Sequence, residues 1–223
     1  MWVVNFLTSS LGKKLIMSLT GLFLIVFLLV HLVGNLQLMA GDGGVSFNVY
    51  AKFMTTNPVI KTLSIGLYTF ILLHIVQGIL IWLTNKNAKK SKYAVAAKNL
   101  SWASKNMANL GIFITVFLIL HLWQFWFQNK IGNIPYINIE GGQYQDFYTL
   151  VNDSYQNIFF VVFYVISMIV IGFHLSHGFQ SAFQTLGLNH KKYTPIIKSL
   201  GTGYSILVPL GFAIIPVYMY MFN

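Results

Sequence analysis

The chain of 223 residues is 56% hydrophobic and only 8% charged, whereas a soluble domain carries about 25% charged residues. Together with a mean hydropathy of +0.67, this composition excludes a soluble globular protein and predicts one integral membrane domain over residues 1–223. The chain has no cysteine, which excludes disulfides, thiolate-bound iron–sulfur clusters and covalently attached c-type haem. Any metal must be bound by nitrogen or oxygen atoms.

The apolar residues fall into five runs, each long enough to cross about 30 Å of hydrocarbon as a helix. Residues 1–12 are expected to form a short interfacial segment before the first run. Because that run lacks a small-residue cleavage site, we expect it to be retained and not removed as a signal peptide. Prolines near the helix starts are tolerated, whereas those inside the fifth run should kink it. The predicted helices span 14–38, 58–84, 105–128, 156–185 and 195–222.

All 14 basic residues are lysines, the net charge is +10, and most lysines precede the first run or follow the second and fourth runs. Membrane topology and anionic lipid explain such clusters better than nucleic acid does. The larger group is Lys13, Lys14, Lys86, Lys89, Lys90, Lys92, Lys98, Lys105, Lys191, Lys192 and Lys198. The positive-inside rule therefore places the N-terminus in the cytoplasm of a bacterial cell, with a multi-pass chain in the inner membrane. Segment 129–155 is then expected to be a structured external loop.

Four of the five runs carry an interior histidine: His31, His74, His121 and His174. An ionisable residue inside a membrane span is a functional hypothesis by default. At a rise of 1.5 Å per residue, His31 and His121 lie about 25 Å and 24 Å from the cytoplasmic helix ends, in the outer part of the membrane. The other two lie about 24–27 Å from the external ends of their helices, toward the cytoplasm. Two pairs at two depths predict two stacked haems, each between two histidines.

Small residues one helical turn from three of these histidines agree with this hypothesis: Gly34, Gly78 and Gly178. A glycine there leaves room for a porphyrin, although such glycines alone usually indicate helix packing. His121 departs from the pattern. His177 shares a helix face with His174 and remains an alternative ligand, but we favour a position beside a haem propionate. A zinc site is less favoured, because zinc gathers three or four ligands at one depth.

At these residues the chain resembles the single-chain, two-haem cytochrome b subunit of succinate dehydrogenase and fumarate reductase (respiratory complex II), in the form found in Bacteroidetes and relatives. The resemblance covers nearly the whole chain, and the stretch around His174 is its most specific part. The matching stretches are Ser18-Leu19-Thr20-Gly21, Phe27-Leu28-Leu29-Val30-His31-Leu32-Val33-Gly34-Asn35, Leu73-His74-Ile75-Val76-Gln77-Gly78, Ile119-Leu120-His121-Leu122-Trp123, and His174-x-x-x-Gly178 with Phe183-Gln184-Thr185-Leu186-Gly187.

The resemblance implies an all-α bundle of five transmembrane helices that encloses two b-type haems. It implies that His31 and His121 bind the outer haem, that His74 and His174 bind the inner one, and that His174 is preferred to His177. Lys13, Lys14, Lys192 and the Ser18 hydroxyl are candidate partners of the inner propionates. Some fumarate reductases of the family carry a membrane glutamate two residues before the last ligand. Gly172 stands there, and a transmembrane carboxylate relay is not supported.

The function implied is a membrane anchor that passes electrons from an iron–sulfur subunit through two haems b to a quinone, with menaquinone expected. A flavoprotein subunit would oxidise succinate, so this chain would take part in electron transport of the tricarboxylic acid cycle without acting on succinate itself. Lipid is a further partner, nucleic acid is not expected, and the whole complex could form a higher oligomer. Two alternatives stay open: a cytochrome b subunit of a hydrogenase or formate dehydrogenase, and a haem-free transporter with a histidine relay.

The quinone should bind beyond the outer haem if the two haems form a chain across the membrane. A quinone site needs an apolar cleft with a few groups that hydrogen-bond its carbonyls and deliver protons. A site near Ser18 and the inner haem is the alternative, and the outer groups could equally cap the first helix or be solvated. The candidate residues are Asn35 and Gln37 at the close of the first helix, and Asn48, Tyr50 and Lys52 in the following loop.

Overall fold

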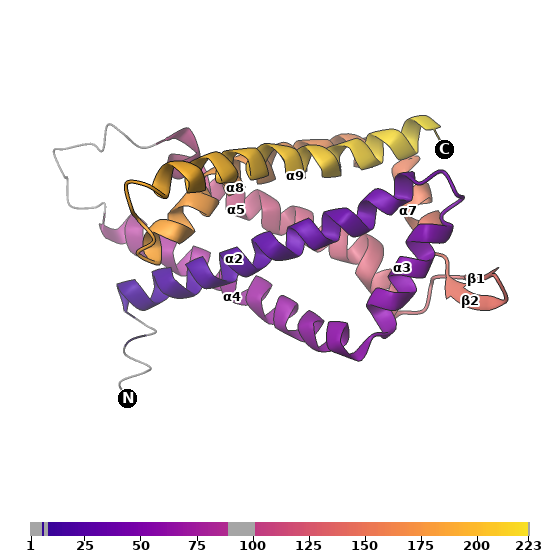
Figure 1. Cartoon of the computed structure of the whole chain (residues 1–223). Helices are drawn as coiled ribbons and strands as arrows, with labels where there is room; N and C mark the ends of the chain where they lie inside the picture. Colours follow the sequence, from indigo (N-terminus) through magenta and orange to yellow (C-terminus); the bar gives the residue numbers. More distant parts are fainter. Residues whose placement is uncertain (1–5, 7–8, 89–100, 223) are drawn as a thin grey trace.

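The computed structural model describes residues 6, 9–88 and 101–222. Five of its helical segments are long and apolar enough to cross a membrane, which confirms the predicted all-α membrane bundle (Figure 1). Each predicted run is found, with its ends moved by a few residues. The spans are α2 (Ser10–Asn35) continued by η1 (Leu36–Met39), α4 (Pro58–Ala88), α5 (Trp102–His121) continued by η2 (Leu122–Phe127) and α6 (Gln128–Lys130), α8 (Ile158–Thr185) and α9 (Thr194–Phe222).

Local sequence signals explain where these helices begin. The side chains of Ser9, Ser101 and Asn157 each accept a hydrogen bond from a backbone N–H in the first turn of α2, α5 and α8, which satisfies one of the donors that a helix start leaves free. Pro58 is the first residue of α4, where the absence of an N–H costs no hydrogen bond. Pro209 lies buried within α9, as Pro216 also does.

The bundle is packed unevenly. α8 and α9 lie against each other along their lengths, with α2 beside them (Figure 1). Glycines permit this approach: a Cβ at Gly172 of α8 would lie 3.0 Å from the Ser205 carbonyl oxygen of α9, and a Cβ at Gly211 would meet Leu32 of α2. In contrast, α4 lies along α2 and contains no buried residue over 58–86. The apolar side chains of α4 are therefore exposed on the bundle, where they can contact lipid.

Most of the hydrophobic core lies in the outer half of the bundle. It joins η1 and the ends of α2 and α5 to α7 (Phe147–Tyr155) and to α8 and α9. Its buried members include the fully enclosed Met219. The inner half has fewer large buried side chains, so the two halves offer different surroundings to any group bound at each depth. The core consists of Leu32, Leu38, Phe117, Val151, Tyr155, Val161, Tyr164, Met168, Val208, Ile215 and Met219.

Two connections at the outer end are more regular than the sequence suggested. The loop expected to carry Asn48, Tyr50 and Lys52 is instead the helix α3 (Val45–Thr56). The Asp42 carboxylate accepts hydrogen bonds from the backbone N–H groups of Gly44 and Ser46 and from the Ser46 hydroxyl, which lower the pKa of Asp42 and hold the helix start. The loop prediction failed because Asp42 lies among Gly41, Gly43 and Gly44, and such a glycine-rich stretch resembles an ordinary turn.

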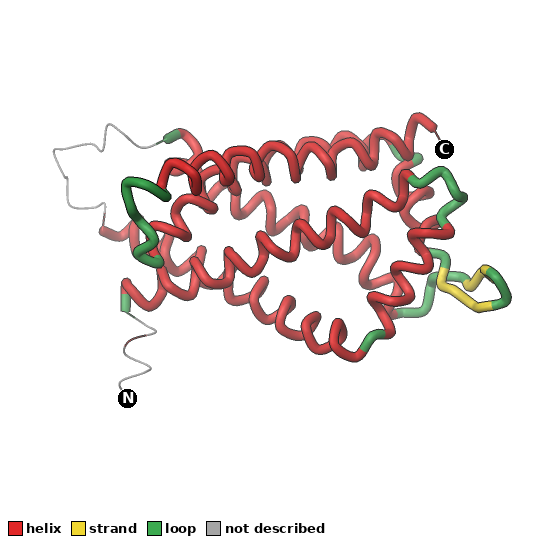
Figure 2. The backbone as a smooth tube through the Cα atoms, in the orientation of Figure 1, coloured by secondary structure: helices red, strands yellow, loops and turns green. Residues whose placement is uncertain are grey.

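The expected structured loop over 129–155 contains a β-hairpin followed by α7. Strands β1 (Tyr136–Ile139) and β2 (Gly142–Gln145) pair antiparallel, with Ile139 opposite Gly142. The two turn residues, Glu140 and Gly141, have φ of 47° and 81°, as a tight hairpin turn requires. Figure 2 shows this hairpin at one end of the helical bundle. The hairpin and α7 thus confirm the prediction that this segment is structured.

The clustered lysines gather at one end of the bundle. The start of α2, the end of α4 and the α8–α9 connection lie together, opposite α3, the hairpin and the C-terminus (Figure 1). Lys89, Lys90, Lys92 and Lys98 lie outside the described residues. The side of the membrane that each end faces stays a prediction from the positive-inside rule.

We predict that Lys191→Cys will react with a membrane-impermeant thiol reagent only after the cells are opened. The matched control, Asn138→Cys in the hairpin, should react in intact cells, because it lies at the opposite end of the spans; both residues are exposed. The absence of native cysteine makes each reaction specific. Labelling of Lys191→Cys in intact cells, with protection of Asn138→Cys, would show that the orientation is reversed.

Candidate functional site

The structure brings the four candidate ligand histidines into two pairs. The His31 and His121 rings, from α2 and α5, have centroids 5.9 Å apart and an interplanar angle of 87°. The His74 and His174 rings, from α4 and α8, have centroids 6.3 Å apart at 67°. These are the two pairs expected from helix depth. The ligand role of each histidine stays a prediction.

The spacing of each pair suits a metal ion between the rings. A metal–imidazole bond is about 2.0–2.1 Å long and the ring centroid lies about 1.1 Å behind the nitrogen, so trans imidazoles on one metal have centroids about 6.3 Å apart. The observed centroid distances are 5.9 and 6.3 Å. Two neutral imidazoles on opposite sides of an iron are a ligand set that b-type haem accepts. The donors present therefore fit the haem that the sequence predicted.

Hydrogen bonding at the inner pair defines the state of His74. Thr20 Oγ1 lies 3.1 Å from His74 Nδ1. The Thr20 hydroxyl donates its single hydrogen to a backbone carbonyl, with Ile16 O at 2.8 Å and Met17 O at 3.2 Å. With that hydrogen used, the Thr20 oxygen can accept from Nδ1–H of His74, and the Met17 backbone also hydrogen-bonds this ring. The contact thus favours the Nδ1–H tautomer, which leaves the Nε2 lone pair free. A free Nε2 is what a haem iron requires.

Two buried polar atoms beside the inner pair have no hydrogen-bond partner among the described residues: His174 Nδ1 and Gln77 Oε1. Gln77 lies one turn after His74 on α4. A buried polar group without a partner is costly, and such atoms in a protein usually indicate a bound group. Their position supports a polar or metal-containing ligand between α4 and α8. His177, also on α8, is partly buried and is not the ring that contacts His74.

Aromatic side chains surround the outer pair. Phe27 stacks on His31 with a centroid distance of 5.2 Å, and Phe212 lies 5.6 Å from the same ring. Phe117 and Phe125 lie 5.7 and 5.3 Å from the His121 ring. These rings cover much of both histidines, which are half-buried in the bundle. The inner pair has no comparable shell in the described part of the chain.

Tyr164 of α8 defines the state of His121. Its hydroxyl donates to Gln124 Oε1 at 2.6 Å and lies 3.4 Å from His121 Nδ1. With the phenol hydrogen given to Gln124, the Tyr164 oxygen can accept from Nδ1–H of His121. This arrangement favours the tautomer of His121 that has Nε2 free. At His31, the Asn35 amide donates to the His31 carbonyl oxygen at 2.7 Å and lies 3.3 Å from Nδ1.

A π-helical turn explains why His121 lacks the glycine that accompanies the other three. α5 ends at His121 and continues as the wider turn η2. Such turns insert one residue into the helical repeat and occur often at functional sites. In this wide turn Gln124 contacts Tyr164 and Phe125 contacts His121. These two side chains occupy the positions one turn after the histidine, where the other three histidines have a glycine.

The predicted pocket glycines have different surroundings. A Cβ at Gly34 would collide with the Tyr50 ring, and a Cβ at Gly78 would lie 3.4 Å from Met17 Cε, whereas Gly178 has no atom within 4 Å in that direction. Gly21, which the sequence analysis did not assign to the site, would meet His74 Cε1 at 3.3 Å. Ser18 is buried, and its hydroxyl donates to Lys14 O at 2.9 Å.

The residues that sequence reasoning missed are Thr20, Gly21, Gln124 and Tyr164. Thr20 and Gly21 lie in a stretch that was matched to the family, but no spacing rule connects them to a histidine on another helix. Gln124 was noted only as an exception to the glycine pattern. Tyr164 had no sequence signal beyond a hydroxyl in an apolar run.

The residues proposed to bind quinone lie in or near α3, but they differ in whether their polar groups are already hydrogen-bonded within the protein. Asn48 is fully buried: its amide donates to Asp146 Oδ1 at 3.0 Å and accepts from the Tyr148 N–H at 2.9 Å, so it connects α3 to α7. Lys52 Nζ donates to Gln143 O at 2.9 Å. Tyr50 covers Gly34, and burial raises the pKa of its hydroxyl, which therefore stays a neutral donor.

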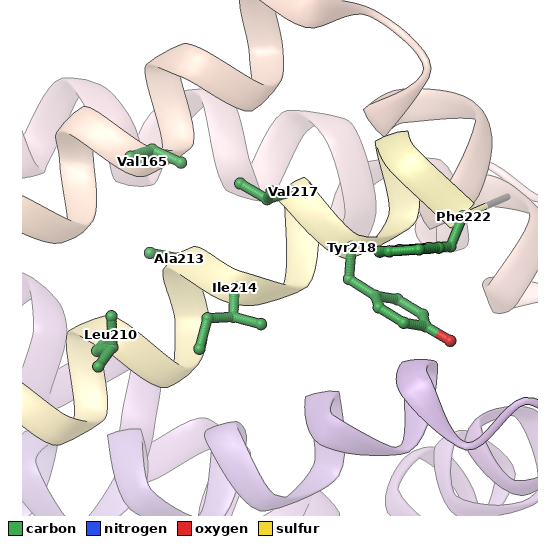
Figure 3. Close-up of a pocket in the computed structure, with 7 residues that line it drawn as sticks. All are labelled: Val165, Leu210, Ala213, Ile214, Val217, Tyr218 and Phe222. Carbon is green, nitrogen blue, oxygen red and sulfur yellow. The ribbon is translucent and has the colours of Figure 1, made fainter.

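A shallow groove of about 320 Å³ lies between α8 and α9. Figure 3 shows its lining, in which the Tyr218 ring turns away from Val165. Every other lining side chain is apolar, so the groove has one hydroxyl at most for a quinone carbonyl, and an acyl chain of lipid suits it better. The remaining lining residues are Leu210, Ala213, Ile214, Val217 and Phe222.

No protein-family model, no curated protein and no solved structure matches this chain.

We predict that His74→Ala or His174→Ala will remove the inner haem and spare much of the outer one, because each haem depends on its own pair. His31→Ala or His121→Ala should do the reverse. His177→Ala is the matched control within α8 and should retain both haems. Haem content and reduced-minus-oxidised spectra of the purified variants measure this. Loss of the inner haem in His177→Ala but not in His174→Ala would reassign the ligand.

Proposed function

We propose that this chain is the dihaem cytochrome b anchor of a succinate:quinone oxidoreductase, which carries electrons from an iron–sulfur subunit through two haems b to a quinone. The observation that carries the proposal is the pair of histidine contacts at two depths, with centroid distances of 5.9 and 6.3 Å. The motif resemblance supplies the choice of complex II over other dihaem cytochromes.

A b haem supplies a reversible one-electron carrier when bound. The residues of this chain would provide the axial imidazoles and determine how dry each site is. Thr20 and Tyr164 leave Nε2 of His74 and His121 free for an iron. The aromatic shell around His31 and His121 makes the surroundings of the outer site more apolar than those of the inner site. A dry surrounding influences the potential of a bound haem, so the two sites are expected to differ in potential.

The lysine-rich end suits the soluble partners of the complex. Lys14, Lys191, Lys192 and Lys198 are exposed, and none of them forms an ion pair within the described ranges. An unpaired basic surface attracts acidic protein surfaces and anionic lipid headgroups alike. We propose that the iron–sulfur subunit binds here, next to the inner pair. The haem-free transporter has no comparable explanation for two ring pairs at metal-binding distance.

The quinone is proposed to bind near the outer pair, where α3 covers the end of α2. Tyr50 and Lys52 are the better candidates there, because Asn48 already uses its amide oxygen and nitrogen within the protein. Asn35 lies one turn beyond His31 and bonds its carbonyl, and Gln37 follows in η1. Menaquinone is the proposed species. The site lies on the side from which external water can supply protons.

We predict two non-covalent b haems per chain, and co-purification of the tagged chain with a flavoprotein and an iron–sulfur protein. A pyridine haemochrome assay counts the haems, and succinate-dependent reduction of both haems in the isolated complex tests the partners. Two haems with a hydrogenase or formate dehydrogenase subunit would favour the alternative cytochrome. A chain that contains no haem after mild extraction would contradict the proposal.

A further inference from the structure

In each pair, one histidine lies near a hydroxyl oxygen that comes from a third helix, which carries neither histidine of that pair. Thr20 of α2 approaches His74, and Tyr164 of α8 approaches His121. Neither hydroxyl belongs to the four candidate ligands. Among the described residues, His174 Nδ1 has no hydrogen-bond partner, and the side-chain hydrogen-bonding group near the His31 ring is the Asn35 amide. The two sites therefore share one arrangement, in which one imidazole is oriented by a hydroxyl and the other is not.

Both hydroxyls are restricted to the role of acceptor. Thr20 bonds the carbonyl oxygens of its own helix at 2.8 and 3.2 Å, and Tyr164 bonds Gln124 Oε1 at 2.6 Å. A hydroxyl has one hydrogen and two lone pairs, so each oxygen presents a lone pair to the imidazole. An imidazole that donates Nδ1–H to this lone pair satisfies both groups, which favours one tautomer and one direction of the ring.

We propose that Thr20 and Tyr164 are positioning residues that hold His74 and His121 as Nδ1–H tautomers, present Nε2 to a haem iron and lower the reduction potential of the haem in each pair. This inference rests on the proposed haem ligation. A hydrogen bond accepted from Nδ1–H makes the imidazole a more basic ligand, and partners of this kind typically contribute 10- to 100-fold to metal affinity. A more basic ligand favours the ferric state.

The two contacts differ in strength. The Thr20 contact is 3.1 Å long and the Tyr164 contact 3.4 Å. A shorter hydrogen bond polarises the imidazole more, so the inner site should depend more on its hydroxyl than the outer one. The same difference would separate the potentials of two haems that have identical axial ligands.

The test uses Thr20→Val and Tyr164→Phe in the full chain, each with a matched control that removes a span hydroxyl without touching a histidine. Thr115→Val is the control for threonine, because Thr115 Oγ1 also bonds the carbonyl four residues back, at 2.8 Å from Gly111 O. Tyr204→Phe is the control for tyrosine, because its hydroxyl bonds Ile25 O of α2. Thr20→Ser keeps the hydroxyl and should restore the wild-type behaviour.

Redox titration of the two haems and haem retention during dilution are the measurements. Thr20→Val should raise the potential of the inner haem alone and weaken its retention by about 10- to 100-fold. Tyr164→Phe should act in the same direction on the outer haem alone, and both controls should match wild type. Potentials in Thr20→Val and Tyr164→Phe equal to those of their controls would overturn this inference and leave the proposed function intact. A wild-type chain without haem would overturn the proposed function itself.

Discussion

Four imidazoles within an apolar bundle are the constraint on which the rest of the structure depends. A histidine inside a membrane needs a polar partner, and each of these four finds another imidazole at about the distance that a shared metal requires. The fold then has to bring α2 to α5 at one depth and α4 to α8 at the other. Both crossings are needed at once, so four spans carry the histidines, while α9 packs against α8 and adds Phe212 to the aromatic side chains around His31.

The uneven packing follows from this constraint. α8, α9 and the outer part of α2 form a dense core through glycine contacts, and this core holds His31, His121 and their aromatic shell in place. α4 packs mainly along α2, with smaller contacts to α3 and α5, and contains no buried residue over 58–86, although it carries His74. A haem bound by His74, as proposed, would help to fix the position of such a loosely packed helix, so haem binding and bundle stability should be coupled at the inner site.

Sequence reasoning recovered the spans because hydropathy and helix length determine them, and it recovered the histidine pairs because depth along a helix follows from residue number. It could not find Thr20 or Tyr164, since their contacts join helices whose rotation about their axes is not fixed by depth. It also treated α3 as a loop, because the Asp42 cap resembles a turn signal. Nor could it foresee the surroundings of Gly34: the space that was expected to hold a porphyrin is filled by the Tyr50 ring in this structure.

Anomalous X-ray scattering at the iron edge, measured on crystals of the purified complex, tests the central claim most directly. Our account requires one iron between His31 and His121 and a second between His74 and His174, each about 2 Å from two imidazole nitrogens. Two such peaks, at two depths in the bundle, are the predicted result. A single peak, an iron bound to His177, or no iron within the five spans would contradict the account.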